Sequence, residues 1–243
     1  MLFCGEQTWR SWGELPTSVR TGEPSFERIA GRSAFAFMAE DPVLAAVFTE
    51  AMAEGTRAAA PGVVAACDLD GITTLADLGG GNGTLIAALL ASAPELRGVL
   101  FDSADGLGDA AKVLADAGVT QRCEVVAGDF FTAVPTCDAY LLKSVLHDWS
   151  DADCLRILAS VRAAAPAHAT LFVVEPLLPP DPAGLRAAPW MLMSDLNMLV
   201  CTGGRERTRD EFADLFARGG FRLTGVEPCS GPTGFSLLRA VPA

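Results

Sequence analysis

The sequence predicts an α/β fold in which a mostly parallel, seven-stranded sheet with a C-terminal antiparallel hairpin follows a short helical region. From residue 73 onward, short apolar runs alternate with helical stretches, an order typical of a parallel sheet with helices on both faces. The apolar runs are almost unbroken, as expected for strands that are covered on both faces. A short turn rich in proline and glycine joins the last two runs, which indicates an antiparallel pair.

Residues 1–66 are expected to form a helical lead-in segment, and residues 67–243 are expected to form the sheet domain. Apolar side chains recur at helical spacing in the lead-in segment, and Pro42 suits the first turn of a helix. Pro61 and Gly62 indicate a break in the helical pattern, because both residue types interrupt regular helices.

The remaining elements follow from the same periodicities. Strands are expected at 74–78, 97–101, 122–127, 138–142, 169–174, 221–227 and 234–241. Helices are expected at 84–92, 106–117, 151–165, 188–200 and 208–218. Thr208 and Glu211 have the spacing of a capping box at the start of the last helix, and Gly219 and Gly220 supply its stop.

Composition and charge disfavour several classes of protein. The chain has 243 residues, with 18 Lys and Arg against 30 Asp and Glu, so its net charge is −12. This balance argues against a nucleic-acid partner and against an anionic membrane, because both attract a basic surface. No charged leader precedes an apolar run at the N-terminus, and no uninterrupted apolar stretch reaches about 18 residues. The seven cysteines, Cys4 among them, are scattered without a Cys-x-x-Cys pair, so reduced thiols and a cytoplasmic location are expected.

Polar residues collect where the predicted parallel strands end. In an open parallel sheet, ligands bind beyond the carboxyl ends of the strands, so these residues are expected at one edge. In strand order they are Asp77 with the loop Gly79-Gly80-Gly81-Asn82-Gly83, then Asp102, then Gly128-Asp129-Phe130-Phe131, then Lys143-Ser144 with His147-Asp148-Trp149, and then Glu175.

The glycine loop after the first strand is a candidate ligand site. Four glycines in five residues allow backbone to approach a ligand closely, although a tight turn alone would also need glycine. A dinucleotide fingerprint requires a third glycine where this chain has Thr84, which disfavours nicotinamide and flavin cofactors. The loop also differs from the phosphate-binding loop that ends in Gly-Lys-Ser or Gly-Lys-Thr.

Three residues after the next two strands suit a nucleoside. A carboxylate at Asp102 can accept hydrogen bonds from both hydroxyls of a ribose, although an aspartate in a turn is the simpler interpretation. Asp129 can accept from an amino group, and Phe130 can offer an aromatic face to a purine. Read alone, Asp129 would be a loop residue and Phe130 a core residue.

His147 is the candidate general base. An imidazole that is neutral near pH 7 suits proton removal, and a carboxylate such as Glu175 at the same edge would fix its tautomer. The simpler alternative is that His147 caps the helix that follows. The other histidine, His168, lies in a polar stretch and is expected to be a solvated loop residue. Lys143 interrupts an apolar run, so a buried amine with an anion or carbonyl groups nearby is expected.

Taken together, these residues resemble the small-molecule O-methyltransferases that use S-adenosylmethionine, the family of plant phenolic methyltransferases and bacterial antibiotic-tailoring enzymes. The matching stretches are DLGGGNG at 77–83, GDFF at 128–131, LLKSVLHDW at 141–149, VVEP at 173–176 and GGRERT at 203–208. The resemblance implies a Rossmann-like class I methyltransferase fold, with residues 67–243 as the S-adenosyl-L-methionine-binding catalytic domain.

The resemblance also implies a role for each matching residue. His147 would be the catalytic base, oriented by Glu175 and Glu206. The cofactor-binding residues would be Asp77, Gly79, Gly80, Gly81, Asp102, Asp129, Phe130, Lys143 and Ser144. The acceptor pocket would be lined by Phe35, Phe48, Met52 and Asn197, although phenylalanine and methionine at helical spacing are more often core residues.

The chain departs from the family pattern in two places. Ser103 follows the ribose acid where the family usually has leucine, so the next turn is expected to differ. The chain also begins after the winged-helix-like dimerisation domain with which the family usually starts. A monomer or weak dimer, or a partner subunit of another protein, is therefore expected, and the negative charge also opposes self-association.

The resemblance implies transfer of a methyl group to a hydroxyl of a small aromatic or polyketide-type natural product. No spaced set of metal ligands and no Asn/Asp-Pro-Pro-aromatic motif occurs, so neither a metal nor a nucleic-acid acceptor is expected. Two alternatives stay open: a non-methylating reaction such as hydroxylation, decarboxylation or a pericyclic step, and an inactive partner subunit that binds the cofactor.

Overall fold

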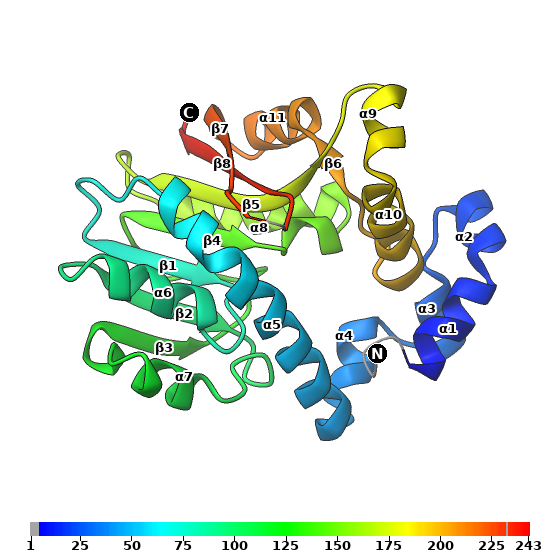
Figure 1. Ribbon diagram of the computed structural model, residues 1–243, viewed down its shortest axis with the longest axis horizontal. Coiled ribbons are helices and arrows are strands. Elements are labelled where there is room, and N and C mark those ends of the chain that lie inside the picture. Colours follow the sequence, from blue (N-terminus) through cyan, green and yellow to red (C-terminus); the bar gives the residue numbers. More distant parts are fainter. Residues whose placement is uncertain (1–4, 232) are drawn as a thin grey trace.

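A central sheet lies between two sets of helices in the computed structural model, which describes residues 5–231 and 233–243 (Figure 1). The strand order is β3-β2-β1-β4-β5-β8-β7, in which β1 to β5 pair in parallel and β8 runs antiparallel to both of its neighbours. A two-residue strand, β6, pairs with β5 outside this order. The predicted fold class, a mostly parallel seven-stranded sheet with a C-terminal antiparallel hairpin, is confirmed.

The strands are β1 (Thr74–Leu78), β2 (Arg97–Asp102), β3 (Cys123–Ala127), β4 (Ala139–Lys143), β5 (Thr170–Leu178), β6 (Arg207–Thr208), β7 (Phe221–Pro228) and β8 (Phe235–Pro242). The helices before the sheet are α1 (Glu6–Gly13), α2 (Leu15–Thr21), α3 (Ser25–Ala30), α4 (Ala34–Ala39) and α5 (Pro42–Ala66). The later helices are α6 (Thr84–Ser92), α7 (Ala110–Asp116), α8 (Asp151–Ala164), α9 (Pro182–Ala187), α10 (Pro189–Cys201) and α11 (Arg209–Arg218), with short 3-10 turns η1 (Thr120–Arg122) and η2 (Leu146–Asp148).

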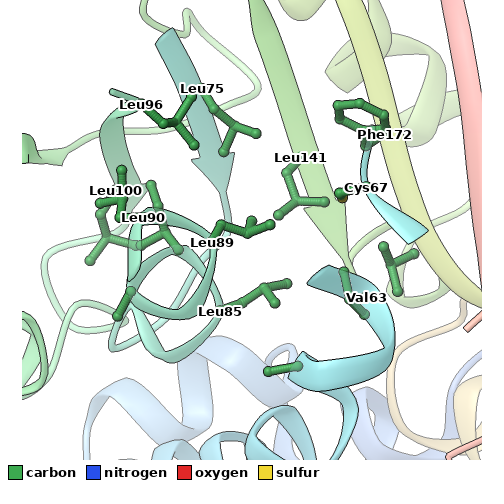
Figure 2. Close-up of a cluster of buried hydrophobic side chains, with 14 of the residues drawn as sticks. Val63, Cys67, Leu75, Leu85, Leu89, Leu90, Leu96, Leu100, Leu141 and Phe172 are labelled. Atoms are coloured by element: carbon green, nitrogen blue, oxygen red, sulfur yellow. The ribbon is translucent and has the colours of Figure 1, made fainter. Parts of the chain in front are cut away.

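Two hydrophobic clusters cover the two faces of the sheet, because successive side chains of a strand point to opposite faces. On one face, Leu75, Leu100 and Leu141 pack against α5 and α6, as Figure 2 shows around Leu85 and Leu89. The other face packs against α8 and α11, so the central parallel strands β1, β4 and β5 are buried on both sides, while the edge strand β3 is partly exposed. This explains why the strands read as unbroken apolar runs in the sequence.

Two expected elements differ in extent from the structure. The helix expected at 106–117 is confined to α7, because turns fill residues 104–109 before it. The strand expected at 169–174 extends to Leu178 in β5, since residues 175–178 continue to pair with β8 and β6. This extension places Glu175 inside the strand rather than after it. The capping box of Thr208 and Glu211 is present at the start of α11.

The break expected at Pro61 and Gly62 is wrong, because α5 continues through both residues to Ala66. Ala60 and Val63 on the same stretch are buried in the hydrophobic cluster that covers α6, and this packing holds the helix together. The glycine has a packing role. A Cβ atom on Gly62 would lie 2.0 Å from the backbone oxygen of Ser230, between β7 and β8.

We therefore expect Gly62→Ala to lower the free energy of unfolding by about 1–3 kcal/mol, the usual cost of overpacking a core. Gly55→Ala on the same helix is the matched control, because a Cβ atom there meets nothing within 4 Å. The control should keep or raise stability, since alanine favours helix by up to about 1 kcal/mol. Denaturant unfolding monitored by circular dichroism measures both variants, and equal stability of the two would contradict the packing role.

The lead-in helices lie on one side of the sheet, where α1, α2 and α3 contact α10 (Figure 1). Asp41 caps α5 by accepting hydrogen bonds from the backbone of Val43 and Leu44, as expected for a helix with Pro42 in its first turn. The division into a lead-in segment and a sheet domain at residue 66 stays a prediction.

Neither a membrane helix nor a disulfide occurs in the described part of the chain. Among residues 5–231 and 233–243, no helix combines the length and the apolar character needed to cross a membrane. No disulfide joins any two of the six cysteines in these ranges, while Cys4 lies outside the described residues.

Candidate active site

The candidate site residues gather at the point where the strand order reverses. β1 is flanked by β2 on one side and by β4 on the other, so the loops after β1 and β4 leave the sheet in opposite directions. The loop after β1 carries the glycines, and the loop after β4 carries His147. The expectation that these residues share one edge of the sheet agrees with this parallel pairing.

The glycine loop needs glycine for its conformation and for access. Gly79, Gly81 and Gly83 have φ angles of 70°, 57° and 80°, a region that other residues rarely adopt. A Cβ atom on Gly81 would meet nothing within 4 Å, so the loop backbone is open there. On Gly80, a Cβ atom would lie 2.8 Å from the carboxyl carbon of Asp77. The loop is therefore closed toward the sheet and open on its outer side, as a ligand cradle must be.

A half-buried carboxyl group, that of Asp102, and a fully buried one, that of Asp77, lie beside this loop. One oxygen of Asp102 accepts a hydrogen bond from the backbone N–H of Gly81 at 2.8 Å, and the other accepts from Ser103 at 2.7 Å. Burial raises the pKa of Asp102 despite these bonds. Asp77 is 2% exposed, and its Oδ2 atom has no hydrogen-bond partner within the described structure. Burial, reinforced by Asp102 and opposed by Lys143, raises the pKa of Asp77 to about 7. An unpaired buried oxygen is costly, so a polar ligand group is expected there.

Phe130 and Asp129 differ in how close they come to the loop. A Cβ atom on Gly79 would lie 3.6 Å from the Phe130 ring, which places this ring over the loop. The carboxylate of Asp129 accepts hydrogen bonds from the backbone of Phe131 at 2.8 Å and from the hydroxyl of Thr132 at 3.2 Å. Phe130 thus presents its ring near the cradle, while Asp129 stabilises its own turn.

Lys143 and Ser144 follow one another at the end of β4, and Lys143 interacts both with Asp77 beside the glycine loop and with Glu175. The Nζ atom of Lys143 donates to the Ser144 hydroxyl at 3.1 Å. Burial lowers the pKa of Lys143, opposed by the negative charges of Glu175 and Asp77. Ser144 has a φ angle of 53° and is the one non-glycine residue with a positive φ among the described residues. Such strain is typical of functional sites.

His147 lies on the turn η2 with two carboxyl groups against one ring nitrogen. Its Nδ1 atom is 3.2 Å from Oε1 of Glu206 and 3.5 Å from Oε2 of Glu175. Both glutamates are buried, at 2% and 0% exposure. The Nε2 atom lies 3.9 Å from the carboxylate of Asp148. We call His147, Glu175 and Glu206 the triad. Because both glutamates approach Nδ1, a proton is held there and Nε2 is the nitrogen left for a reacting group.

Each glutamate of the triad is held by its own set of donors. Oε1 of Glu175 accepts the backbone N–H groups of Val145 at 3.0 Å and His147 at 3.3 Å. Oε1 of Glu206 accepts the hydroxyl of Ser194 on α10 at 2.7 Å. These donors fix the two glutamates in position, while the buried Oε2 atom of each still lacks a hydrogen-bond partner in the described structure.

The expectation of an imidazole that is neutral near pH 7 does not hold for the triad as the structure presents it. Burial of the ring lowers the pKa of His147, but the surrounding carboxylates, Glu175 first, outweigh burial and raise it to about 10. Burial raises the pKa of Glu175 and Asp148 at the same time. These groups share protons, so the cluster titrates as a unit.

The triad also brings three possible metal-ligand atoms within 4.8 Å of one another. The expectation that no metal takes part stays a prediction. A metal on Nδ1 would compete with the proton that this nitrogen shares with the two glutamates. A turnover assay after dialysis against a chelator measures whether the triad works with a proton, rather than a metal ion, on Nδ1.

Two of the four expected acceptor-pocket residues, Phe35 and Phe48, belong to an aromatic group that includes Trp149. Phe35 stacks on Trp149, with ring centroids 5.7 Å apart, and its centroid lies 6.3 Å from that of Phe48. Trp149 directly follows the turn of His147, so these aromatic rings lie beside the triad. Met52 is 42% exposed. The Oδ1 atom of Asn197 accepts a hydrogen bond from Trp12 at 3.1 Å, which ties α10 to α1.

Two parts of the site were given no role from the sequence. Asp148 and Trp149 were expected at the same edge of the sheet as His147, which they directly follow, but no contact with the imidazole or with other aromatic rings was inferred for them. Ser194 gave no signal, because a serine in a helix rich in leucine and methionine has no distinctive spacing.

Comparisons with known proteins match the whole of this architecture. The model of the O-methyltransferase domain family matches residues 12–222. O-demethylpuromycin-O-methyltransferase of Streptomyces alboniger is 46% identical over 96% of this chain, which spans 62% of that protein, less than two thirds of its length. The crystal structure of LaPhzM has a TM-score of 0.91 and 42% identity, covering 99% of this chain and 71% of LaPhzM. The crystal structure of the O-methyltransferase NcsB1 from neocarzinostatin biosynthesis, solved with S-adenosylmethionine and 2-hydroxy-5-methyl naphthoic acid, has a TM-score of 0.86 and 30% identity, covering 96% of this chain and 68% of NcsB1.

Proposed function

The chain belongs to the O-methyltransferase domain family, and from this premise we propose that it transfers a methyl group from S-adenosyl-L-methionine to a hydroxyl of a small aromatic or polyketide-type natural product. The single observation that carries the proposal is the triad beside an open glycine loop. It combines a proton acceptor with a place for a nucleoside-type ligand at one edge of the sheet.

The expected cofactor is S-adenosyl-L-methionine, and the residues around the glycine loop fit it. The open backbone at Gly81 and the buried, unpaired Oδ2 atom of Asp77 can take a polar amino-acid portion. The Asp102 carboxylate, which lies beside Gly81, would accept the ribose hydroxyls, and Phe130 offers a ring beside the loop. When bound, the cofactor supplies a sulfonium whose methyl carbon is electrophilic and whose positive charge lowers the pKa of a nearby imidazolium.

His147 acts as the general base in this proposal. Its Nδ1–H stays with Glu206 and Glu175, which leaves Nε2 to accept the proton of the acceptor hydroxyl. A phenol suits this base, because its pKa near 10 is far below that of an alcohol. The protein also holds the reacting groups in line, and such positioning contributes about 7–11 kcal/mol to lowering a barrier.

A methyl-transfer assay tests this function and separates it from the two alternatives. The chain is incubated with methyl-labelled S-adenosyl-L-methionine and a panel of hydroxylated aromatic compounds, and product label is counted. Label in an ether product supports methyl transfer. Consumption of an acceptor without label would indicate a non-methylating reaction. Cofactor binding in calorimetry without any turnover would indicate an inactive partner subunit.

Glu175→Gln is expected to move the acidic limb of the pH–rate profile to lower pH and to reduce turnover less than loss of His147. Glu175 raises the pKa of His147, so removing its negative charge lowers that pKa, and the base is free of its proton at lower pH. The amide oxygen can still accept from the backbone of Val145 and His147, so the turn is retained. A profile that stays in place or moves to higher pH would argue against this role.

Three further parts of the proposal concern the surroundings of the site. Phe35, Phe48, Met52 and Asn197 line the acceptor pocket, with Trp149 as an additional wall. The chain acts in the cytoplasm on a small molecule, without nucleic acid.

The chain is a monomer or weak dimer because its charge of −12 opposes self-association. Light scattering at micromolar concentration checks the last point, and a stable dimer would contradict it.

A further inference from the structure

Arg207 is a charged side chain buried at 1% exposure beneath the turn that carries His147. Burying a charge is costly unless hydrogen bonds and an opposite charge compensate. Asp151 supplies the opposite charge, at 2.8 Å from Nη2 and 3.1 Å from Nε. The guanidinium also lies 5.9 Å from the centre of the Phe212 ring. Nη2 also lies 3.6 Å from Sγ of Cys154, and the other contacts of the guanidinium are with backbone oxygens.

Two of those oxygens flank His147 in the chain. Nη1 donates to the carbonyl of Leu146 at 2.9 Å, and Nη2 donates to the carbonyl of Trp149 at 2.9 Å. The planar guanidinium can reach both carbonyls in one fixed geometry, whereas the single ammonium of a lysine cannot. Arg207 therefore clasps the backbone on either side of His147 and Asp148.

Residues 204–207, the segment that contains Arg207, contact the turn of His147 at a second place and also contain Glu206. The backbone N–H of Arg205 donates to the carbonyl of His147 at 2.9 Å. A Cβ atom on Gly204 would lie 2.0 Å from that carbonyl oxygen, so the two backbones touch. Glu206 lies between these contacts, and Arg207 pairs with Leu177 in β5, the strand that contains Glu175. Residues 204–207 thus fix the turn of His147 relative to both acids.

We propose that Arg207 is a positioning residue, which acts through the backbone of residues 146–149 to set the distance between His147 and Glu206. It also sets the place of Trp149, whose ring stacks on Phe35. This inference rests on the proposed function for its effect on turnover, but its effect on the imidazole is independent of any methyl transfer.

Arg207→Lys tests this role, because lysine keeps the charge and loses the two-carbonyl contact. With His147 displaced from its acids, its pKa should fall, and kcat should drop about 10- to 100-fold, the usual effect of a small misplacement, with little change in cofactor affinity. The chain has two histidines, so NMR of the imidazole signals follows His147 directly once His168→Gln identifies the other.

Arg122→Lys is the matched control. Arg122 also donates to backbone carbonyls, those of Leu90, Ala93 and Leu96, at distances of 2.8–3.0 Å, but at the end of α6. This variant should lose stability without altering kcat or the His147 titration. If the Arg207→Lys variant titrates like the wild type while it unfolds more easily, Arg207 has only a structural role and the proposal fails.

Asp151→Asn provides the second variant, in case Arg207→Lys does not fold. It leaves the arginine in place and weakens its anchor, so a smaller shift in the same direction is expected. An unchanged His147 titration in this variant would also overturn the proposal. If the wild type transfers no methyl group to any acceptor, the proposed function fails, and the NMR titration alone still decides the role of Arg207.

Discussion

Replacing His147 by alanine is expected to reduce turnover on a phenolic acceptor by about 10²–10⁴-fold, the range in which general bases contribute. The imidazole belongs to a buried cluster in which both glutamates approach its Nδ1 atom, so Nε2 is the nitrogen available for the proton of the acceptor. Because proton removal belongs to the transition state, kcat should fall more than KM rises. The loss should be smaller for acceptors of low pKa, which ionise without help.

His168→Ala is the matched control for this variant. The His168 side chain is 70% exposed and lies before β5. It contacts Asp138, which precedes β4, at 3.1 Å, so both residues lie at the start of their strands rather than at the ligand edge. This variant should retain turnover, and both variants should bind S-adenosyl-L-methionine as the wild type does in calorimetry. Turnover of His147→Ala close to that of the wild type on a neutral phenol would mean that positioning alone drives the reaction, and the general-base assignment would be abandoned.

The second large effect is expected at Asp102, where alanine should weaken binding of S-adenosyl-L-methionine by about 10- to 100-fold, since hydrogen bonds to a charged group contribute about 1.5–3 kcal/mol. The carboxylate also accepts the backbone N–H of Gly81, so its removal loosens the glycine loop. Asp102→Asn should weaken binding by a similar factor, because an amide has one accepting oxygen instead of two.

Asp105→Ala is the control for a general effect of charge. Asp105 is exposed and lies three residues after Asp102, so its removal changes the net charge equally without touching the loop. Calorimetric titration with S-adenosyl-L-methionine measures all three variants. Equal affinities of Asp102→Ala and the wild type would remove Asp102 from the cofactor site.

Most of the fold could be predicted because the central parallel strands β1, β4 and β5 are buried on both faces. Each strand then reads as an apolar run, and Asp77, Asp102 and Lys143 mark where these runs end. The elements that were missed or wrong depend on contacts between distant residues. β5 extends beyond its apolar run because β8 and β6 continue to pair with it. Helix α5 passes through Pro61 because its neighbours are buried against α6.

The site was predictable at the level of residues but not at the level of geometry. His147, Glu175 and Glu206 could be found from the family motifs, and the structure brings them together. That both acids would face the same nitrogen, and so raise the pKa of the imidazole, depends on how the turn η2, the strand β5 and the segment before β6 pack together. The buried contact of Arg207 with the carbonyls around His147 is likewise invisible in a linear motif.

The residues placed at the acceptor and the residues of the triad come from different parts of the chain, and this separation affects how such a protein can evolve. Phe35 and Phe48, which we place at the acceptor, come from the helices before residue 66, while the triad comes from the turn η2, the strand β5 and residues 204–207. Substitutions in the first helices can therefore change which molecule is recognised without disturbing the acid–base groups. Selection for a new acceptor would act on one part of the gene and leave the chemical machinery of the other intact.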